Sequence, residues 1–463
     1  MGMAATTTMI HNSRAGRRQA MRRIRPRRSP AIPLLLLAWA GAAGVVWLWW
    51  GNTPYVQPTT AGRLTAAGRI TGLLGGYAIA LVVLQMARVP ALERRVGSDR
   101  VARWHAMSGR YAVSLVVAHV ALILWGYSEQ SGQPVVQQSV AVVMDYPRMI
   151  EATAGTVLLL VVGFVSAGVL RRRLRYETWY YIHLLTYAAV YLTFWHQLAT
   201  GAEFAGSATA RGVWYALYGS VTALVLWYRV LVPVRLNMRH RMRVAETVEE
   251  APGVVSVLIT GRRLHRLGAE PGQFFRWRFL AEGMRWSANP YSLSAPPRPD
   301  LLRITVKAVG GHSSALATLE PGTRVWAEGP YGAMTASRRR GGKVLLLAGG
   351  AGITPLRALF ETLPAAPGDL TLLYRARSRQ DLALWAELEE IAAERGARLV
   401  YAVNGPDGAR PEITAQGLRR MLPDIDRHDV YLCGPPGLAE ESYSALREAG
   451  VPERRIHHES FEM

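Results

Sequence analysis

The sequence predicts a multidomain fold: an all-α six-helix transmembrane bundle, then an antiparallel β-barrel domain and an α/β domain with a parallel sheet. Two observations support this. Long apolar runs are confined to the first half of the chain, and after about residue 236 short alternating runs separated by Pro and Gly replace them. The predicted divisions are a basic segment at 1–30, the helical bundle at 31–232, the barrel at 233–340 and the α/β domain at 341–463.

Each apolar run of the first half is long enough to cross a membrane, because ~20 helical residues span the ~30 Å of hydrocarbon. An alternative for the first run is a signal peptide. That run is too long for a typical signal sequence, and no clean small-residue cleavage site follows it, so we interpret it as the first helix. The six runs lie at about 31–50, 66–87, 105–127, 150–170, 179–198 and 211–232.

The segments between these runs alternate in charge, and this predicts the orientation of the chain. Arginine and lysine collect on the cytoplasmic side of membrane proteins. The segments at 51–65, 128–149 and 199–210 carry few basic residues or none. We therefore predict a multi-pass protein of the plasma (cell inner) membrane with both termini in the cytoplasm. The arginines of the cytoplasmic segments are Arg14, Arg17, Arg18, Arg22, Arg23, Arg25, Arg27 and Arg28, then Arg88, Arg94, Arg95, Arg100 and Arg103, and finally Arg171, Arg172, Arg173 and Arg175.

The formal net charge of +21 does not indicate a nucleic-acid partner. Much of this charge lies beside predicted membrane ends, where basic residues meet anionic lipid headgroups. The expected partner is therefore the lipid bilayer. The single cysteine, Cys433, excludes an intrachain disulfide framework and suits a reducing compartment.

The cytoplasmic part contains two different patterns. Runs such as VVSVLIT and LLRITVKAV predict the strands of a small antiparallel barrel. After Gly341, KVLLLAGGAGITPLRALFETL predicts a strand, a glycine turn and a helix, and DLTLLYRARS, ARLVYAVNG and DVYLCGPPG predict further strands. Strands that alternate with helices predict a parallel α/β sheet.

Four histidines interrupt the predicted membrane helices. His105 and His119 lie fourteen residues apart on the third run, and His183 and His196 lie thirteen apart on the fifth. One such histidine is most simply explained by a hydrogen bond between helices or by a proton relay. Two on each helix favour metal ligands, because fourteen residues span ~21 Å and return to within ~40° of the same helix face.

The depths of the four histidines predict two stacked sites. If both helices run outward, His105 matches His183 in depth, and His119 matches His196. Haem iron accepts axial imidazoles, and two opposed histidines leave it six-coordinate, which suits electron transfer. We predict two b-type haems. The thirteen-residue spacing turns an ideal helix by a remainder of ~140°, so we expect the fifth helix to be kinked or locally rewound.

Four short motifs follow one another in the cytoplasmic part: NPYSLSAPP at 289–297, VGGHSSAL at 309–316, GGAGITP at 349–355 and CGPPG at 433–437. The third motif follows an apolar strand and opens a helix. Its glycines let the backbone approach a pyrophosphate, and a helix N-terminus favours negative charge. Taken singly, each motif has a simpler explanation, such as a proline-rich turn or a polar loop before a short helix.

In this order, and behind six helices with paired histidines, the motifs resemble those of the NADPH oxidase and ferric reductase superfamily of prokaryotic type, over about 31–463. The resemblance implies that His105 and His183 hold an inner haem, and that His119 and His196 hold an outer haem. It also implies a place beside the outer haem for Arg69. An alternative for Arg69 is an interfacial arginine that extends toward the membrane surface.

The resemblance also implies a site for FAD. Tyr291 would lie against the isoalloxazine and Ser292 would hydrogen-bond the ring. Asn289 stands where many relatives carry His or Arg, so the contact to the flavin phosphates departs from the usual pattern. Phe461 resembles the terminal aromatic residue that covers the flavin, although two residues follow it. The implied flavin contacts are Asn289, Pro290, Tyr291, Ser292, Leu293 and Ser294, with Gly310, Ser313 and Ser314 at the pyrophosphate.

A nicotinamide nucleotide would bind the last domain. Cys433 falls where the family places a cysteine near the nicotinamide; an alternative is a small buried core residue. Basic residues follow the next strand, where the adenosine ribose would lie. Arginine pairs well with a 2′-phosphate, so NADPH is favoured over NADH, although a solvated basic loop has the same composition. The implied contacts are Gly349, Gly350, Gly352, Ile353, Thr354 and Pro355, then Arg375, Arg377, Ser378 and Arg379, and Cys433, Gly434 and Pro435.

These assignments predict an NAD(P)H oxidase or a ferric-chelate reductase. A nicotinamide gives up two electrons as a hydride and a haem accepts one, so a flavin must stand between them. We expect electrons from cytoplasmic NADPH to pass through FAD and two haems to dioxygen, forming superoxide, or to ferric iron on the outer face. An alternative is a membrane subunit that delivers electrons to a separate partner protein or to a quinone.

Overall fold

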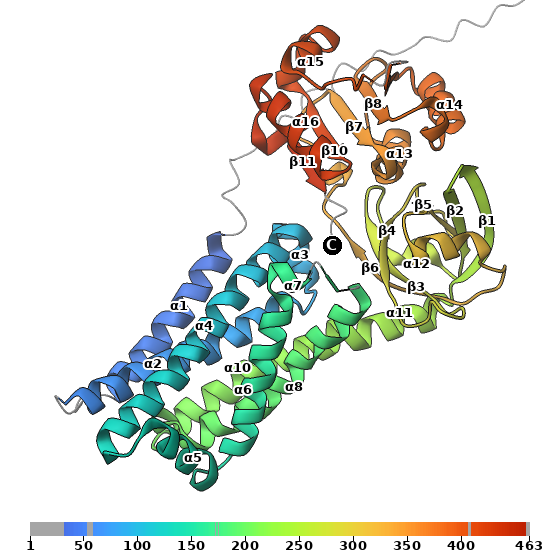
Figure 1. Ribbon diagram of the computed structural model, residues 1–463. Helices are drawn as coiled ribbons and strands as arrows, with labels where there is room; N and C mark the ends of the chain where they lie inside the picture. Colours follow the sequence, from blue (N-terminus) through green and yellow to red (C-terminus); the bar gives the residue numbers. More distant parts are fainter. Residues whose placement is uncertain (1–31, 53–58, 172, 175, 406–408, 460–463) are drawn as a thin grey trace, which may run out of the picture.

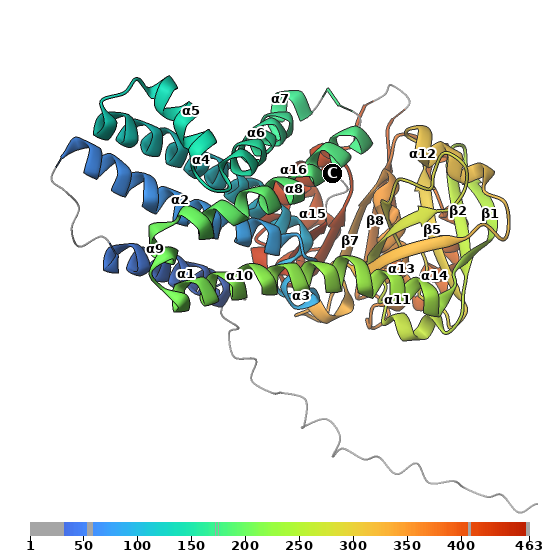
Figure 2. The ribbon, with the colours of Figure 1, turned by 90° about the horizontal axis from the view of Figure 1, so that it is seen from below.

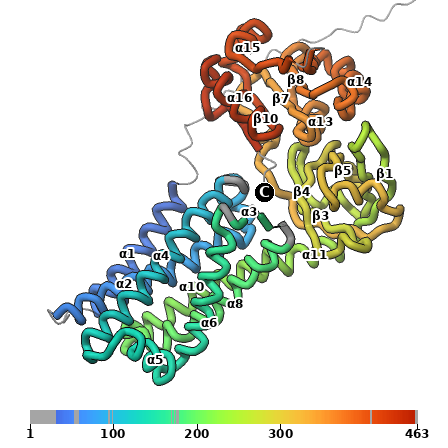
Figure 3. The backbone as a smooth tube through the Cα atoms, in the orientation of Figure 1, coloured from blue at the N-terminus to red at the C-terminus, as the bar shows by residue number. Residues whose placement is uncertain are grey.

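The computed structural model describes residues 32–52, 59–171, 173–174, 176–405 and 409–459. A helical part is followed by two parts that contain β-sheets, as Figures 1 and 3 show from blue and green through yellow to red. This order confirms the coarse fold class predicted from the sequence. The predicted basic segment at 1–30 lies outside the described residues.

The helical part contains long helices joined by short ones. Five stretches in the described part of the chain are long and apolar enough to span a membrane, namely 32–51, 60–85, 100–131, 149–166 and 208–240. Tyrosine, tryptophan and histidine lower the hydropathy of α8, although its 25 residues are sufficient in length. The helices are α1 Ile32–Gly51, α2 Thr60–Gln85, α3 Pro90–Val96, α4 Ser98–Ser131, α5 Val135–Asp145, α6 Met149–Ser166, α7 Gly168–Arg171, α8 Tyr176–Thr200, α9 Ala202–Ala205, α10 Ala208–Leu226 and α11 Val232–His240.

Glycines allow the long helices to pack closely. A Cβ atom on Gly126 of α4 would lie 3.0 Å from the backbone nitrogen of Thr65 in α2. A Cβ atom on Gly155 of α6 would lie 2.9 Å from the backbone oxygen of Ala189 in α8. Small residues at such contacts are typical of membrane helices, where dispersion contacts between close backbones replace the hydrophobic effect.

A π-helical turn, Trp227–Leu231, joins α10 to α11. Pro233 has no N–H and would clash with the carbonyl of Arg229 in a regular α-helix, and the wider turn relieves this clash. The chain therefore continues as one rod from the helical part to the β-sheets, as Figure 2 shows. Asn237 fastens this rod to β6, because its side chain donates to the Ala327 carbonyl at 2.9 Å and accepts from the Ala327 N–H at 2.8 Å.

The middle part consists of two three-stranded antiparallel sheets with orders β1-β2-β5 and β4-β3-β6. Single bridges, Arg243 to Arg324 and Leu293 to Ile304, connect them. Alternating side chains such as Phe275, Trp277 and Phe279 are fully buried between the sheets. The strands are β1 Arg243–Ala251, β2 Val254–Thr260, β3 Phe274–Phe279, β4 Asn289–Ser292, β5 Leu301–Lys307 and β6 Val325–Tyr331.

The last part is a five-stranded parallel sheet with the order β11-β10-β7-β8-β9. Leu346 of β7 points into one apolar cluster and Leu345 and Leu347 point into another, so both faces of the sheet are covered. The strands are β7 Val344–Gly349, β8 Leu370–Ala376, β9 Arg398–Val403, β10 Asp429–Cys433 and β11 Ile456–Glu459, and the helices are α13 Ile353–Thr362, α14 Trp385–Arg395, α15 Ala415–Met421 and α16 Pro436–Glu448.

The contact of α6 with α8 predicts unequal effects of two glycine substitutions in α6. Gly155→Ala forces a methyl group against the Ala189 backbone, whereas a Cβ atom on Gly163 meets only Val113 at 3.5 Å. Both changes gain the same helix propensity. We expect Gly155→Ala to be about 1–3 kcal/mol less stable than Gly163→Ala. Thermal unfolding of both detergent-solubilised variants measures this, and equal unfolding temperatures would contradict the close contact.

Candidate functional site

The four histidines form two pairs between α4 and α8. The ring centroids of His105 and His183 lie 5.9 Å apart, and those of His119 and His196 lie 6.5 Å apart. Two imidazoles that bind one metal ion from opposite sides have metal–nitrogen bonds of ~2.0 Å each. With the distance of about 1 Å from each nitrogen to the centre of its ring, the two ring centroids lie about 6 Å apart. Each pair therefore has the spacing of two imidazoles on opposite sides of one metal ion.

The other ring nitrogens have partners that orient the imidazoles. His105 Nδ1 lies 3.2 Å from the carbonyl of Val82, and His119 Nδ1 lies 2.7 Å from the carbonyl of Gly68. A carbonyl only accepts, so each Nδ1 carries the proton and leaves the lone pair of Nε2 for a metal. His183 Nδ1 lies 3.1 Å from Ser166 Oγ.

His196 differs from the other three histidines. Its Nδ1 atom is buried and has no hydrogen-bond partner among the described residues. A buried polar atom without a partner costs free energy. Hydrogen bonds within the chain therefore do not explain why the ring of His196 lies here. Metal ligation through its second nitrogen is one explanation.

The expected rewinding of the fifth membrane helix is not found. Helix α8 runs as a continuous α-helix from Tyr176 to Thr200, yet both of its histidines meet their partners on α4. The ~140° difference in direction is therefore accommodated by the side chains and not by a change of helix type.

Sequence reasoning missed the glycines of α2 that make room for the outer pair. A Cβ atom on Gly72 would lie 2.5 Å from His119 Nδ1, and Gly68 supplies the carbonyl that accepts from this atom. The available signal was the spacing of Gly68, Gly72 and Gly76, a small residue at every fourth position of an apolar helix.

Arg69 forms an ion pair with the buried carboxylate of Glu203. Arg69 Nε donates to Glu203 Oε1 at 2.8 Å, and a second nitrogen donates to the Asn52 carbonyl at 3.3 Å. Both partners lie at the ends of membrane helices, so this contact is also compatible with the alternative of an interfacial arginine that extends toward the membrane surface. A role for Arg69 beside the outer haem stays a prediction.

The flavin motif contains buried polar atoms that lack partners. Ser292 Oγ and Asn289 Nδ2 are buried, and neither has a hydrogen-bond partner in the part of the chain that the structure describes. Tyr291 Oη lies 3.2 Å from His312 Nδ1, and the two rings stack. Burial raises the pKa of Tyr291 to about 12, so its hydroxyl stays protonated. These groups suit the edge of a flavin ring.

Other members of the predicted flavin segment are already engaged. Leu293 is fully buried, and Ser294 Oγ accepts a hydrogen bond from Thr305 at 2.7 Å inside the sheets. Ser313 Oγ accepts from the Gly310 N–H at 3.1 Å and shapes the loop before Ser314. Roles for these residues and for Pro290 in flavin binding stay predictions.

The glycine loop and the CGPPG motif meet at the carboxyl ends of adjacent strands β7 and β10. A Cβ atom on Gly352 would lie 2.0 Å from the carbonyl oxygen of Cys433. Gly350 has a φ of +53°, and the loop opens directly into α13. The chain leaves β7 toward β8 on one side and β10 lies on the other, which is the switch point where open α/β sheets bind ligands. Ile353, Thr354 and Pro355 begin α13, and Gly434 and Pro435 follow β10.

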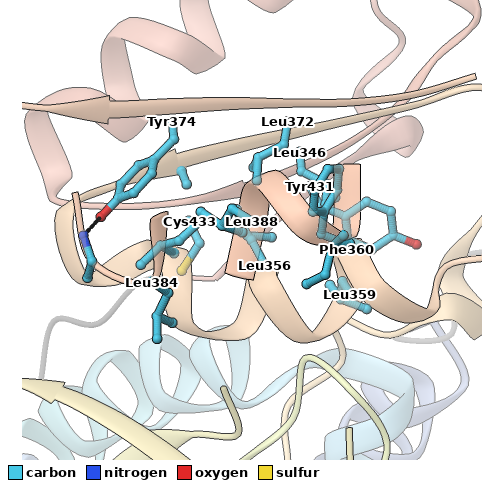
Figure 4. Close-up of a cluster of buried hydrophobic side chains, with 14 of the residues drawn as sticks. Leu346, Leu356, Leu359, Phe360, Leu372, Tyr374, Leu384, Leu388, Tyr431 and Cys433 are labelled. Atoms are coloured by element: carbon cyan, nitrogen blue, oxygen red, sulfur yellow. Dashed lines mark hydrogen bonds between the residues drawn. The ribbon is translucent and has the colours of Figure 1, made fainter. Parts of the chain in front are cut away.

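Cys433 lies in an apolar cluster. It is fully buried, and Figure 4 shows it among Leu356, Leu384 and Leu388. This placement matches the core residue that the sequence left open as an alternative. A role near the nicotinamide stays a prediction.

The basic segment after β8 divides into one buried and several exposed residues. Arg375 is buried and pairs with Glu441 at 2.9 Å, whereas Arg377, Ser378 and Arg379 are exposed. Ser378 Oγ donates to Asp381 at 2.9 Å. This hydrogen bond, assisted by Lys307, lowers the pKa of Asp381 despite partial burial. Phe461 lies outside the described residues.

Comparisons with known families match both halves of this architecture. Residues 71–194 match the family described as ferric reductase like transmembrane component, and residues 346–443 match the oxidoreductase NAD-binding domain. The first match contains His105, His119 and His183 and ends two residues before His196. The chain therefore combines a ferric reductase like transmembrane component with an oxidoreductase NAD-binding domain. It is a membrane-associated oxidoreductase that binds flavin and a nicotinamide nucleotide.

Relatives of this chain are named as reductase components or electron transfer subunits. The 3-ketosteroid-9-alpha-monooxygenase ferredoxin reductase component of Mycolicibacterium smegmatis is 32% identical over 230 residues, which cover 48% of this chain and 65% of that protein. A probable dihydroorotate dehydrogenase B (NAD(+)) electron transfer subunit of Methanopyrus kandleri is 30% identical over 209 residues. The match covers 45% of this chain and 76% of that protein. A solved Amycolatopsis cytochrome P450 reductase is 26% identical with a TM-score of 0.42, covering 48% of this chain and 69% of that one. The chain spans just under two thirds of the first relative.

Ion pairs hold the middle part and the last part of the chain together. Arg303 of β5 donates to both carboxylate oxygens of Glu387 at 2.6 and 2.8 Å, and Arg357 of α13 reaches the same carboxylate at 2.7 Å. Burial raises the pKa of Glu387, but the two arginines outweigh this effect and lower it overall. The contact keeps the glycine loop beside the flavin motif.

Ser292→Ala tests the flavin site. The hydroxyl has no partner within the described chain, so its removal should leave the flavin-free protein at least as stable. Loss of one hydrogen bond to a bound ring should weaken flavin binding about 2- to 10-fold. Flavin titration and thermal unfolding of the stripped protein measure the two effects. Unchanged flavin affinity would contradict a role for Ser292 in flavin binding. The control variant is Ser287→Ala.

Proposed function

We propose that the chain is a transmembrane oxidoreductase that passes electrons from cytoplasmic NADPH, through FAD and two b-type haems, to an acceptor on the outer face of the plasma (cell inner) membrane. The proposal includes six membrane-spanning helices, with α8 as the fifth, a closed barrel at 233–340, and both termini in the cytoplasm. Its domains are those predicted from the sequence, with haem in the bundle at 31–232, FAD in the barrel and the nucleotide at 341–463.

The observation that carries the proposal is the pairing of histidines at two levels between the same two helices. A contact between two helices is sufficient to explain a single pair. Two pairs with centroid separations of 5.9 and 6.5 Å, on helices that run together through the membrane part, support two metal sites in series. The carbonyl partners of His105 and His119 fix the tautomer that a metal needs.

When bound, the nicotinamide, flavin and haems supply hydride transfer, the change from two electrons to one, and one-electron transfer. The chain's own residues position these groups. His105 and His183 would hold the inner haem, and His119 and His196 the outer one. Tyr291 and Ser292 would hold the flavin ring, and no side chain is required as a general acid or base along the membrane path.

NADPH is proposed over NADH because of the exposed arginines after β8. Arg377→Ala should weaken NADPH binding by about 2 kcal/mol, roughly 30-fold, and change NADH binding little, because only NADPH carries the 2′-phosphate. KM values with both nucleotides, from reduction of a soluble dye, measure this. Arg420→Ala is the control, and equal changes for both nucleotides would contradict the assignment.

The acceptor is proposed to be dioxygen or ferric iron. The second candidate function is delivery to a partner protein or quinone, and the relatives named as reductase components support it. Superoxide dismutase-sensitive reduction of cytochrome c identifies dioxygen as the acceptor, whereas ferrozine capture identifies ferric iron. Negligible activity of the purified chain in both assays favours a separate partner.

His119→Ala tests the order of the path. We expect this variant to retain one haem, to lose reduction of external acceptors and to keep NADPH-dependent reduction of soluble dyes. The pyridine haemochrome assay and the two activity assays measure these quantities, with exposed His265→Ala as the control. Equal loss of dye and acceptor reduction would contradict the ordered path.

The absorption spectrum of the purified chain tests the function as a whole. We expect b-type haem bands at about two haems per flavin, and their reduction when NADPH is added without oxygen. A flavin signal without haem would contradict haem ligation and would favour a role for the four histidines in helix packing or in a proton relay.

A further inference from the structure

A large cavity lies where the helical part meets the flavin part. Its volume is about 990 Å³, and its walls come from α8, α10, the π-turn, α11, β3 and β6. None of the four paired histidines and none of Asn289 to Ser294 lines it. The cavity therefore shares no residue with the proposed haem and flavin sites, although it borders the flavin motif at Ala288, whose carbonyl accepts from Arg276 at 3.2 Å.

One end of the cavity is an aromatic groove between α8 and α10. Tyr191, Tyr215 and Trp195 line this groove and are 64%, 49% and 39% exposed, so the groove is open to the lipid side of the helices. From Tyr180 to Trp195 the groove follows α8 for about 20 Å. This length is similar to the ~15 Å thickness of one leaflet of the hydrocarbon layer. The groove therefore has the length and polarity of a site for an acyl chain.

The other end of the cavity carries excess positive charge. Arg229, Arg276 and Arg278 line it, and the only carboxylate among the described lining residues is that of Glu328. Arg229 and Arg276 lie 3.8 and 3.9 Å from Glu328 Oε2, which is too far for hydrogen bonds. Two positive charges are left without a matching carboxylate, and poorly compensated charge favours an anionic ligand.

Among the three arginines, Arg278 gives the strongest indication of an anionic ligand. Its Nε atom is buried and lacks a hydrogen-bond partner among the residues that the structure describes. Arg276 and Arg278 lie two residues apart on β3, so both point to the same face of the strand, toward the helices. The cationic end lies beside the π-turn where the last membrane helix leaves the helical bundle.

We propose that this cavity binds an anionic glycerophospholipid, with the phosphate on Arg229, Arg276 and Arg278 and one acyl chain in the aromatic groove. Basic pockets between helices at the cytoplasmic side of a membrane are suited to lipid headgroups. A neutral quinone would leave the arginine charge uncompensated, and a soluble anion would leave the aromatic groove unfilled. Since the walls come from both parts of the chain, the lipid joins the membrane helices to β3 and β6.

Native mass spectrometry of the delipidated full-length chain in detergent tests this proposal. We expect one bound dioleoyl phosphatidylglycerol at concentrations where dioleoyl phosphatidylcholine, with the same acyl chains, does not bind. Arg278→Gln should weaken phosphatidylglycerol binding about fivefold, because one arginine near an anionic headgroup contributes ~1 kcal/mol and ~1.4 kcal/mol corresponds to tenfold. Arg239→Gln removes the same charge from exposed α11, outside the cavity, and should change nothing.

Gly219→Trp tests the acyl groove separately. Gly219 lines the cavity, and a Cβ atom there meets no atom within 4 Å, so a side chain can start at this position without a clash and place its indole in the groove. This variant should lose phosphatidylglycerol binding while its unfolding temperature stays the same. Equal binding of the two lipids, equal effects of Arg278→Gln and Arg239→Gln, or a co-purified quinone that phosphatidylglycerol does not displace would each overturn the proposal.

Discussion

The partial burial of four imidazoles within apolar helices is the constraint on which the rest of this structure depends. An imidazole in hydrocarbon needs partners for both ring nitrogens. His105 and His119 use carbonyls of α2, and His183 uses a hydroxyl of α6, so three of the four rings tie α4 and α8 to a neighbouring helix. Each pair then faces across the space between α4 and α8. The helix packing and the proposed haem sites are therefore consequences of the same contacts, and Gly72 of α2 is needed because the ring of His119 leaves no room for a larger side chain.

A second constraint is the rigid connection between the membrane part and the flavin part. The rod formed by α10, the π-turn and α11 ends in the paired hydrogen bonds of Asn237 with Ala327. The hydroxyl of Tyr181 donates to the carbonyl of Trp286 at 2.6 Å, and Arg88 stacks over Tyr331. Electron transfer between a flavin and a haem requires that they be held in fixed positions, and these contacts supply such support. The proposed lipid would add to the same junction.

Local sequence patterns were sufficient for the coarse fold and for the family. Long apolar runs, alternating strands and a glycine turn after a strand depend on neighbouring residues alone, so helices, antiparallel sheets and a parallel sheet could be predicted in the correct order. The short helices α3, α5, α7 and α9 were not predicted, because α3, α7 and α9 have only seven, four and four residues and α5, although apolar, is too short to cross a membrane. A kink or local rewinding was expected in α8, and the rewinding is not found, because the ideal-helix estimate leaves out how far the side chains extend. Partners such as Glu203 for Arg69 and Glu387 for Arg303 are 134 and 84 residues distant, so no local pattern reveals them.

The sequence by itself determined which residues are candidates: four histidines at two depths, a flavin motif, a glycine loop and an excess of arginine beside the membrane. Composition and spacing are properties of the chain, and they survive in any arrangement of the helices. Only the tertiary structure decided which ring nitrogens receive a proton acceptor, that Cys433 lies in an apolar cluster and that Ser292 lacks a partner. It also brought Arg229 and Arg278 to one cavity from a membrane helix and a strand. Such contacts depend on distances between remote segments, which are set when the helices and sheets pack.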